Sequence, residues 1–182
     1  MTNQDTAATG ADTTTNGTTT TTNPDVGGIT LDITDESVVI SMTGGATWDI
    51  PLGPVTLAAG ELRSDPPKPA DLTNALGFVH DYFDDIVGAA PSVLASPSVA
   101  AVGRHARAVA AVEIGSTALA GGYRLRRVDA DEVFRTVVAE PRAQRLHNPG
   151  LDPADVDTII GTLCILLAIM RRMDLTEMSV LP

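Results

Sequence analysis

A glycine followed by two basic residues, Gly103, Arg104 and His105, comes directly after the apolar run 98–102. The run is typical of a strand and the residues after it are typical of a helix, so the glycine lies at a strand–helix junction. Backbone N–H groups at a helix start, together with an arginine, can bind an anion such as phosphate. An ordinary turn with a solvated arginine has the same pattern and is far more common. Gly103 and Arg104 are therefore candidates for phosphate binding, with the ordinary turn as the favoured alternative.

A second polar group is formed by His80, Asp81, Asp84 and Asp85, at helical spacing within the segment 70–87. An imidazole and carboxylates could ligate a divalent metal. The same segment carries apolar residues at helical spacing, and a charged outer face is the usual counterpart of such a buried face. We therefore predict a solvated acidic face, with no metal site and no catalytic residue.

Basic residues gather at Arg124, Arg126 and Arg127, which could join Arg104 and Arg107 in a basic patch. Acidic residues follow within a few positions, so local ion pairs are the favoured alternative. The single cysteine, at position 164, excludes an intrachain disulfide. It lies in an apolar stretch and is predicted to be a buried small hydrophobe rather than a nucleophile.

Composition excludes several function classes. The net charge is −11, and residues 1–102 carry 2 basic and 13 acidic side chains, so general nucleic-acid binding is disfavoured. Only 3% of the residues are aromatic, which argues against base stacking. The apolar run 159–170 is too short to cross a bilayer, and no membrane association is expected. No signal peptide begins the sequence, so the cytoplasm is the expected compartment.

Residues 1–27 differ in composition from the rest of the chain. The first 22 residues include eleven threonines, and no Leu, Ile, Val, Phe or Trp occurs before Val26. Such a segment cannot offset its ordering entropy by burial, so we predict a disordered tail at 1–27 and one domain at 28–182.

Within 28–182, apolar periodicity and turn residues predict the element order. Extended segments are predicted at 29–33, 38–42, 46–50, 55–58, 98–102 and 177–181, and helices at 70–87, 104–112, 129–139 and 153–173. The last helix is apolar on more than one stripe and is expected to be central and buried. The order predicts an α/β domain with a mixed sheet.

Several segments, in their order, resemble a known family. They are 31–33, 51–61, 64–67, 122–125, the Asn-Pro-Gly-Leu-Asp-Pro stretch 148–153 with Asp157, and the closing strand. Together they are similar to the second half of the Ppx/GppA family of exopolyphosphatases and guanosine pentaphosphate phosphohydrolases. The resemblance implies one RNase H-like lobe of a two-lobed actin-like ATPase fold. Members of that family hydrolyse phosphoric anhydrides in the cleft between the lobes.

The resemblance also implies site residues. Asp32 corresponds to an aspartate beside bound metal and phosphate, and Ser37 is retained from the family's glycine-rich turn. The glycines of that turn correspond to Thr34, Asp35 and Glu36 here. Glycines let backbone N–H groups approach a phosphate closely. The carboxylates of Asp35 and Glu36 would instead repel it, since a like-charge pair at 4 Å costs about 1 kcal/mol in water and about 4 near a protein surface. A buried strand-end aspartate bonded to backbone N–H groups is the favoured alternative for Asp32.

These departures lead to two expectations about function. The family's first lobe, which brings the first phosphate loop and the catalytic glutamate, has no counterpart in this sequence. The first expectation is a diverged, non-catalytic module without cofactor, which binds a protein partner or itself through its exposed lobe surface. The second is a hydrolase of polyphosphate or pppGpp that uses Mg²⁺ and receives its first lobe from another chain.

Overall fold

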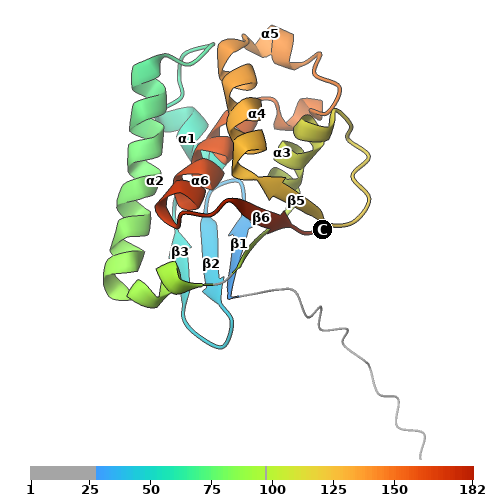
Figure 1. The fold of residues 1–182 in the computed structure, drawn as a ribbon. Helices are drawn as coiled ribbons and strands as arrows, with labels where there is room; N and C mark the ends of the chain where they lie inside the picture. Colours follow the sequence, from blue (N-terminus) through green and yellow to red (C-terminus); the bar gives the residue numbers. More distant parts are fainter. Residues whose placement is uncertain (1–27, 97) are drawn as a thin grey trace, which may run out of the picture.

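The computed structural model describes residues 28–96 and 98–182 (Figure 1). The tail predicted at 1–27 lies outside the described residues. The strands are β1 (Ile29–Ile33), β2 (Val38–Met42), β3 (Thr47–Ile50), β4 (Val99–Val102), β5 (Tyr123–Arg126) and β6 (Glu177–Val180). The α-helices are α1 (Pro54–Gly60), α2 (Pro69–Ala89), α3 (Arg104–Ile114), α4 (Arg127–Ala139), α5 (Arg142–Arg145) and α6 (Ile159–Arg172). Two 3₁₀ turns, η1 (Pro91–Ala95) and η2 (Pro153–Asp155), complete the order.

The six strands form one mixed sheet in the order β3-β2-β1-β4-β6-β5. The hairpin β1–β2 and the pair β2–β3 are antiparallel, as is the pair β5–β6. The central pairs β1–β4 and β4–β6 are parallel. The predicted α/β class with a mixed sheet is thus confirmed. Because β1 and β4 are parallel, the turn 34–37 and the segment 103–105 follow their strands at the same edge of the sheet.

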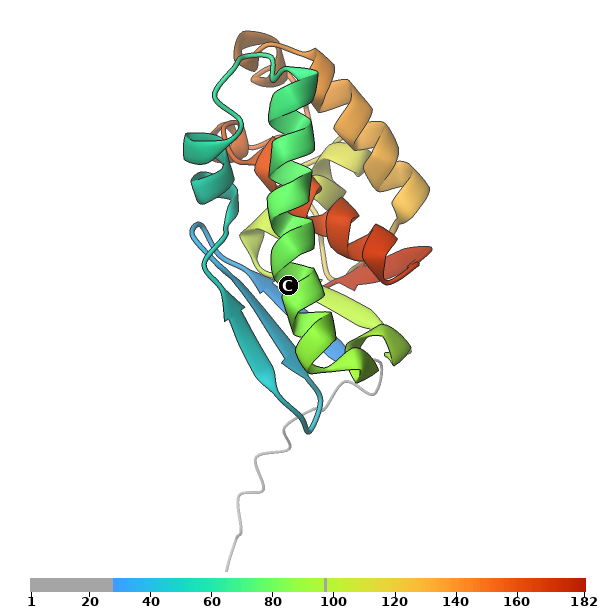
Figure 2. The same cartoon turned by 90° about the vertical axis from the view of Figure 1, so that its left-hand side faces the viewer.

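The core is built around α6. Every residue from Ile159 to Met170 is buried, because the helix is apolar all round and the other long helices surround it. Helices α1, α2, α3 and α4 all pack against α6, and Figure 2 shows the sheet beside this helical layer. The prediction of a central, buried last helix is confirmed.

The prediction of extended chain at 55–58 is wrong, because this segment lies within α1. Pro54 occupies the first helical turn, where its missing N–H costs nothing. The N–H of Val55 donates to the Asp35 carbonyl oxygen at 2.9 Å. Gly53 allows this approach, because a Cβ there would lie 2.4 Å from that oxygen. The start of α1 therefore fixes the turn between β1 and β2.

The predicted start of the last helix at Pro153 is also wrong. Pro153 begins the separate turn η2, in which the Asp152 carboxylate accepts from the Ala154 N–H at 2.8 Å. The helix itself begins only at Ile159. Strand β5 was not predicted, since its alternation of Arg and Leu is short and runs directly into α4.

Candidate functional site

The turn 34–37 is closed by its own polar groups. The Thr34 N–H donates to the Ser37 carbonyl oxygen at 2.9 Å, and the Ser37 N–H donates to Thr34 Oγ1 at 3.0 Å. Thr34 Oγ1 also lies 3.2 Å from Ser37 Oγ. Because the Ser37 N–H is already bonded within the turn, it is not free to bind an anion. Ser37 thus lies in the predicted turn, and its backbone N–H is already bonded to Thr34 Oγ1.

Asp32 and Gly103 lie side by side. Asp32 pairs with Val102 across the parallel strands, and a Cβ on Gly103 would lie 3.5 Å from Asp32 Oδ1. The φ angle of Gly103 is +89°, a conformation that favours glycine. Asp32 is exposed, and within 28–96 and 98–182 its carboxylate has no hydrogen-bond partner, whereas its backbone lies in the sheet. The alternative of a buried, satisfied aspartate is therefore wrong.

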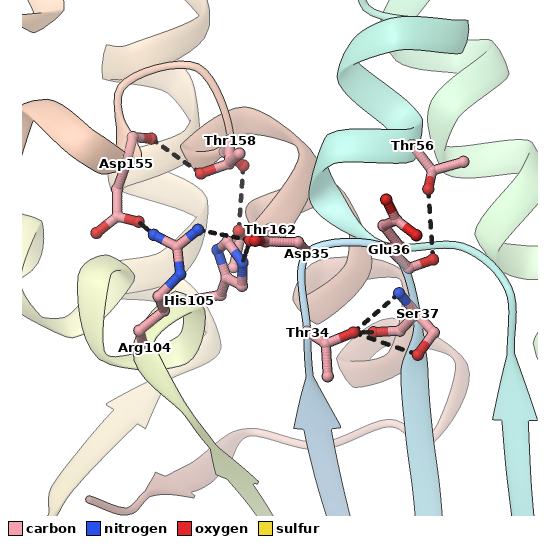
Figure 3. A network of polar contacts seen from close by, with 10 residues as sticks. All are labelled: Thr34, Asp35, Glu36, Ser37, Thr56, Arg104, His105, Asp155, Thr158 and Thr162. Carbon is pink, nitrogen blue, oxygen red and sulfur yellow. Dashed lines mark hydrogen bonds and ion pairs between the residues drawn. The ribbon is translucent and has the colours of Figure 1, made fainter.

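Arg104 bridges two carboxylates (Figure 3). Its Nη2 donates to Asp35 Oδ1 and its Nη1 to Asp155 Oδ1, each at 2.5 Å. The alternative of a merely solvated arginine is wrong, because Arg104 links the β1–β2 turn to the turn η2. We refer to Asp35, Arg104, His105 and Asp155 as the Asp35 network.

His105 adds a buried contact to this network. Its side chain is 1% exposed, and Nε2 lies 2.8 Å from Asp35 Oδ1. Hydrogen bonds from Arg104 and then from His105 lower the pKa of Asp35, so its carboxylate is ionised and can only accept. Nε2 therefore carries the hydrogen. Nδ1 is buried and has no partner in the described part of the chain.

The two carboxylates that flank Arg104 differ in their environment. Asp35 is half-exposed, and the pKa of Arg104 is raised chiefly by its hydrogen bond to this carboxylate. Burial raises the pKa of Asp155, because desolvation disfavours its charged form more than nearby Arg104 favours it. The Arg104 side chain, which could hold a phosphate, thus already holds carboxylates of the protein itself. Although Asp35 is half-exposed, its Oδ1 accepts from both Arg104 and His105.

Other candidate groups are structural. Arg126 pairs with Asp129, so the predicted local ion pair is confirmed for this residue. Arg124 and Arg127 instead pair with Glu177 and Asp174, which are distant in the sequence. Asp84 pairs with Arg172 at 2.5 Å. Across the described residues, no group of three His, Cys, Asp or Glu could hold a metal. Cys164 is buried, as predicted, and burial raises its pKa to about 12. Among the described helices, none is long and apolar enough to cross a membrane.

Sequence reasoning did not identify Asp155 as part of the site, nor Asp35 as the partner of Arg104 and His105. These contacts join residues 51, 69 and 70 positions apart. No local spacing signals them. Only the proximity of a basic pair at a helix start and an acidic turn on the neighbouring strand hints at the contact.

Comparisons with known proteins place the fold. No family model matches the sequence, and no curated protein matches it. A solved exopolyphosphatase-like protein is 19% identical with a TM-score of 0.74, covering 90% of this chain and 58% of that chain. A Ppx/GppA family member from Aquifex aeolicus is 15% identical with a TM-score of 0.73, covering 85% and 52%.

An exopolyphosphatase from Cytophaga hutchinsonii is 17% identical with a TM-score of 0.69, covering 87% of this chain and 54% of that chain. The chain thus spans little more than half the length of each of these structures. The structural similarity of this chain to these proteins confirms the fold that the resemblance of the sequence segments predicted. The chain has the α/β fold of a single lobe of the Ppx/GppA structures, which are built on the actin-like ATPase architecture.

Proposed function

We propose that this domain is a diverged, non-catalytic Ppx/GppA-like module that acts by binding a protein partner or a second copy of itself. The observation that carries the proposal is the Asp35 network. The Arg104 and His105 side chains at the start of α3, which could receive a phosphate, already bind the Asp35 carboxylate, at 2.5 and 2.8 Å respectively.

A phosphate could bind there only by displacing Asp35. The carboxylate is tethered to the same domain and competes as an intramolecular ligand, whose effective concentration is in the millimolar range or above. Its turn is held by the start of α1, since Gly53 packs against it and the Val55 N–H donates to the Asp35 carbonyl oxygen.

An assay of phosphate release tests the proposal. Polyphosphate, pppGpp and ATP are each incubated with the purified chain and Mg²⁺. We expect no release above a blank without protein, because hydrolysis requires positioned phosphates, a metal and a base in one site. Release that disappears in an Asp32→Ala variant would contradict the proposal, because the activity would then belong to this domain.

The exposed Asp32 beside Gly103 favours one alternative, a phosphoric-anhydride hydrolase whose first lobe comes from another chain. Asp32 offers oxygens of the kind that Mg²⁺ prefers. The described residues contain no cluster of three potential metal ligands, so Asp32 would have to hold Mg²⁺ together with water and the substrate phosphates. Adding the separately expressed first lobe of a Ppx/GppA relative separates the two proposals. Release that requires both that lobe and Asp32 would favour the hydrolase.

A further inference from the structure

A pocket of about 230 Å³ lies between the end of α1, the connector 63–67, α5 and the start of α6. Its charged lining consists of three arginines and two aspartates: Arg63, Arg142, Arg145, Asp65 and Asp157. One positive charge is therefore in excess, in a chain whose net charge is −11. None of these residues belongs to the Asp35 network. We call this the arginine pocket.

Arg145 is the buried member of the arginine pocket. Its side chain is only 6% exposed, and its Nη2 lies 3.2 Å from Asp65 Oδ1. Nη1 donates to the Glu140 carbonyl oxygen at 2.6 Å. Nε is buried and has no acceptor in the described part of the chain. A buried donor without an acceptor is destabilising, and an oxyanion oxygen is the acceptor that suits a guanidinium.

Arg142 and Arg63 also have N–H groups without an acceptor. Arg142 donates from Nε and Nη2 to the two oxygens of Asp157, at 2.6 and 3.0 Å, which leaves Nη1. Arg63 donates from Nε to the Ala59 carbonyl oxygen at 3.1 Å, which leaves both of its Nη groups. Neither set of remaining donors has a partner within the residues that the structure describes. The exposed Arg63 and Arg142 thus have N–H groups without an acceptor at the pocket, and the buried Arg145 has one on Nε.

The two aspartates show that the N–H groups of this pocket bind carboxylate oxygens. The Asp65 carboxylate takes the Arg142 backbone N–H on both oxygens, at 2.8 and 2.9 Å, and Asp157 takes the Arg142 guanidinium in a bidentate pair. Both contacts are of a kind that an external oxyanion also makes. Two carboxylates do not balance three arginines, so the pocket has room in its charge for one further anion.

We infer that the arginine pocket binds a small oxyanion, of phosphate or carboxylate type, through Arg63, Arg142 and Arg145. The volume is below the range of about 300–1,000 Å³ that drug-sized ligands occupy, which limits the ligand to a small molecule. The site is separate from the start of α3 and does not depend on the proposed function.

Two-dimensional ¹H–¹⁵N NMR titration tests this inference. Inorganic phosphate and succinate are added separately to the full chain in a buffer free of both. We expect saturable shifts of the amides of Arg63, Arg142 and Arg145 with at least one of them. Tighter binding of phosphate assigns a phosphate ligand, and tighter binding of succinate assigns a carboxylate. Arg63→Gln should weaken binding about tenfold, since it removes a charge-assisted donor at an exposed position.

Arg124→Gln is the matched control, because Arg124 is an exposed arginine paired with Glu177 on the sheet edge. It should leave the affinity unchanged. Arg145→Met should abolish binding, provided that its circular dichroism spectrum shows a folded chain. If that variant does not fold, Arg63→Gln alone decides. The absence of saturable shifts with both anions, or an unchanged affinity in Arg63→Gln, would overturn the inference. Shifts confined to Gly103–His105 would overturn it too and would also contradict the proposed function.

Discussion

Replacing Asp35 with alanine measures how firmly the Asp35 network holds the domain together. The link to Arg104 joins two half-exposed groups and contributes at most about 1 kcal/mol. The link to His105 weighs more, because His105 is buried and its other ring nitrogen already lacks a partner. Leaving Nε2 unpaired as well should cost about 1–3 kcal/mol. We therefore expect the free energy of unfolding to fall by about 1–3 kcal/mol.

Urea denaturation, followed by circular dichroism, measures this change. In thermal unfolding the loss corresponds to about 2–4 °C per kcal/mol for a domain of this size. Glu36→Ala is the matched control. It removes the neighbouring carboxylate, which has no partner within the described residues, and should change stability by less than about 0.5 kcal/mol. Equal effects of the two variants would refute the reasoning, because the loss would then reflect the turn and not the contact with His105.

Three further outcomes follow from the same contacts. Hydrogen bonds from Arg104 and Arg142 lower the pKa of Asp35 and Asp157 respectively, so both stabilise the fold above the ordinary aspartate value of about 3.9 and lose this effect as the pH falls below it. Denaturant titrations at several pH values should show a smaller acid-induced loss in Asp35→Ala. Burial raises the pKa of Asp155, so this carboxylate lowers the stability of the fold once it ionises. The stability of Asp155→Asn relative to the unmodified chain should therefore rise as the pH rises through the ordinary aspartate value. Gly53→Ala should destabilise by about 1–3 kcal/mol because its Cβ would lie 2.4 Å from the Asp35 carbonyl oxygen, whereas Gly60→Ala, which meets nothing within 4 Å, should not destabilise; equal melting temperatures would contradict this packing.

The elements that the sequence predicted well are those with strong periodicity. The β1–β2 hairpin and α6 stand out because their apolar residues alternate or run continuously. Alternate residues of the hairpin are buried, and α6 is buried from 159 to 170, as expected for that helix. Helix α1 was missed because Gly53 and Pro54 are typical of a break in extended chain. The proline instead begins a helix whose start bonds to a turn 20 residues earlier.

The candidate site was predictable only in part. Asp32 and Gly103 lie at the ends of two strands, as predicted, because short apolar runs mark both strands in the sequence. The Arg126–Asp129 pair is local and was expected from its spacing. The contacts of Arg104 with Asp35 and Asp155 depend on how three separate turns meet, which no spacing in the chain encodes. The electrostatic role of Asp35 therefore became clear only in three dimensions.

An NMR titration with pyrophosphate tests most directly whether the Asp35 network closes the start of α3 to phosphate. The amides of Gly103, Arg104 and His105 report on this site, apart from the arginine pocket. In the unmodified chain we expect these three amides to stay unchanged. In an Asp35→Gly variant that is shown to be folded, they should shift saturably, because the competing carboxylate has been removed. Saturable shifts of the same amides in the unmodified chain would contradict the account, since phosphate would then bind despite Asp35.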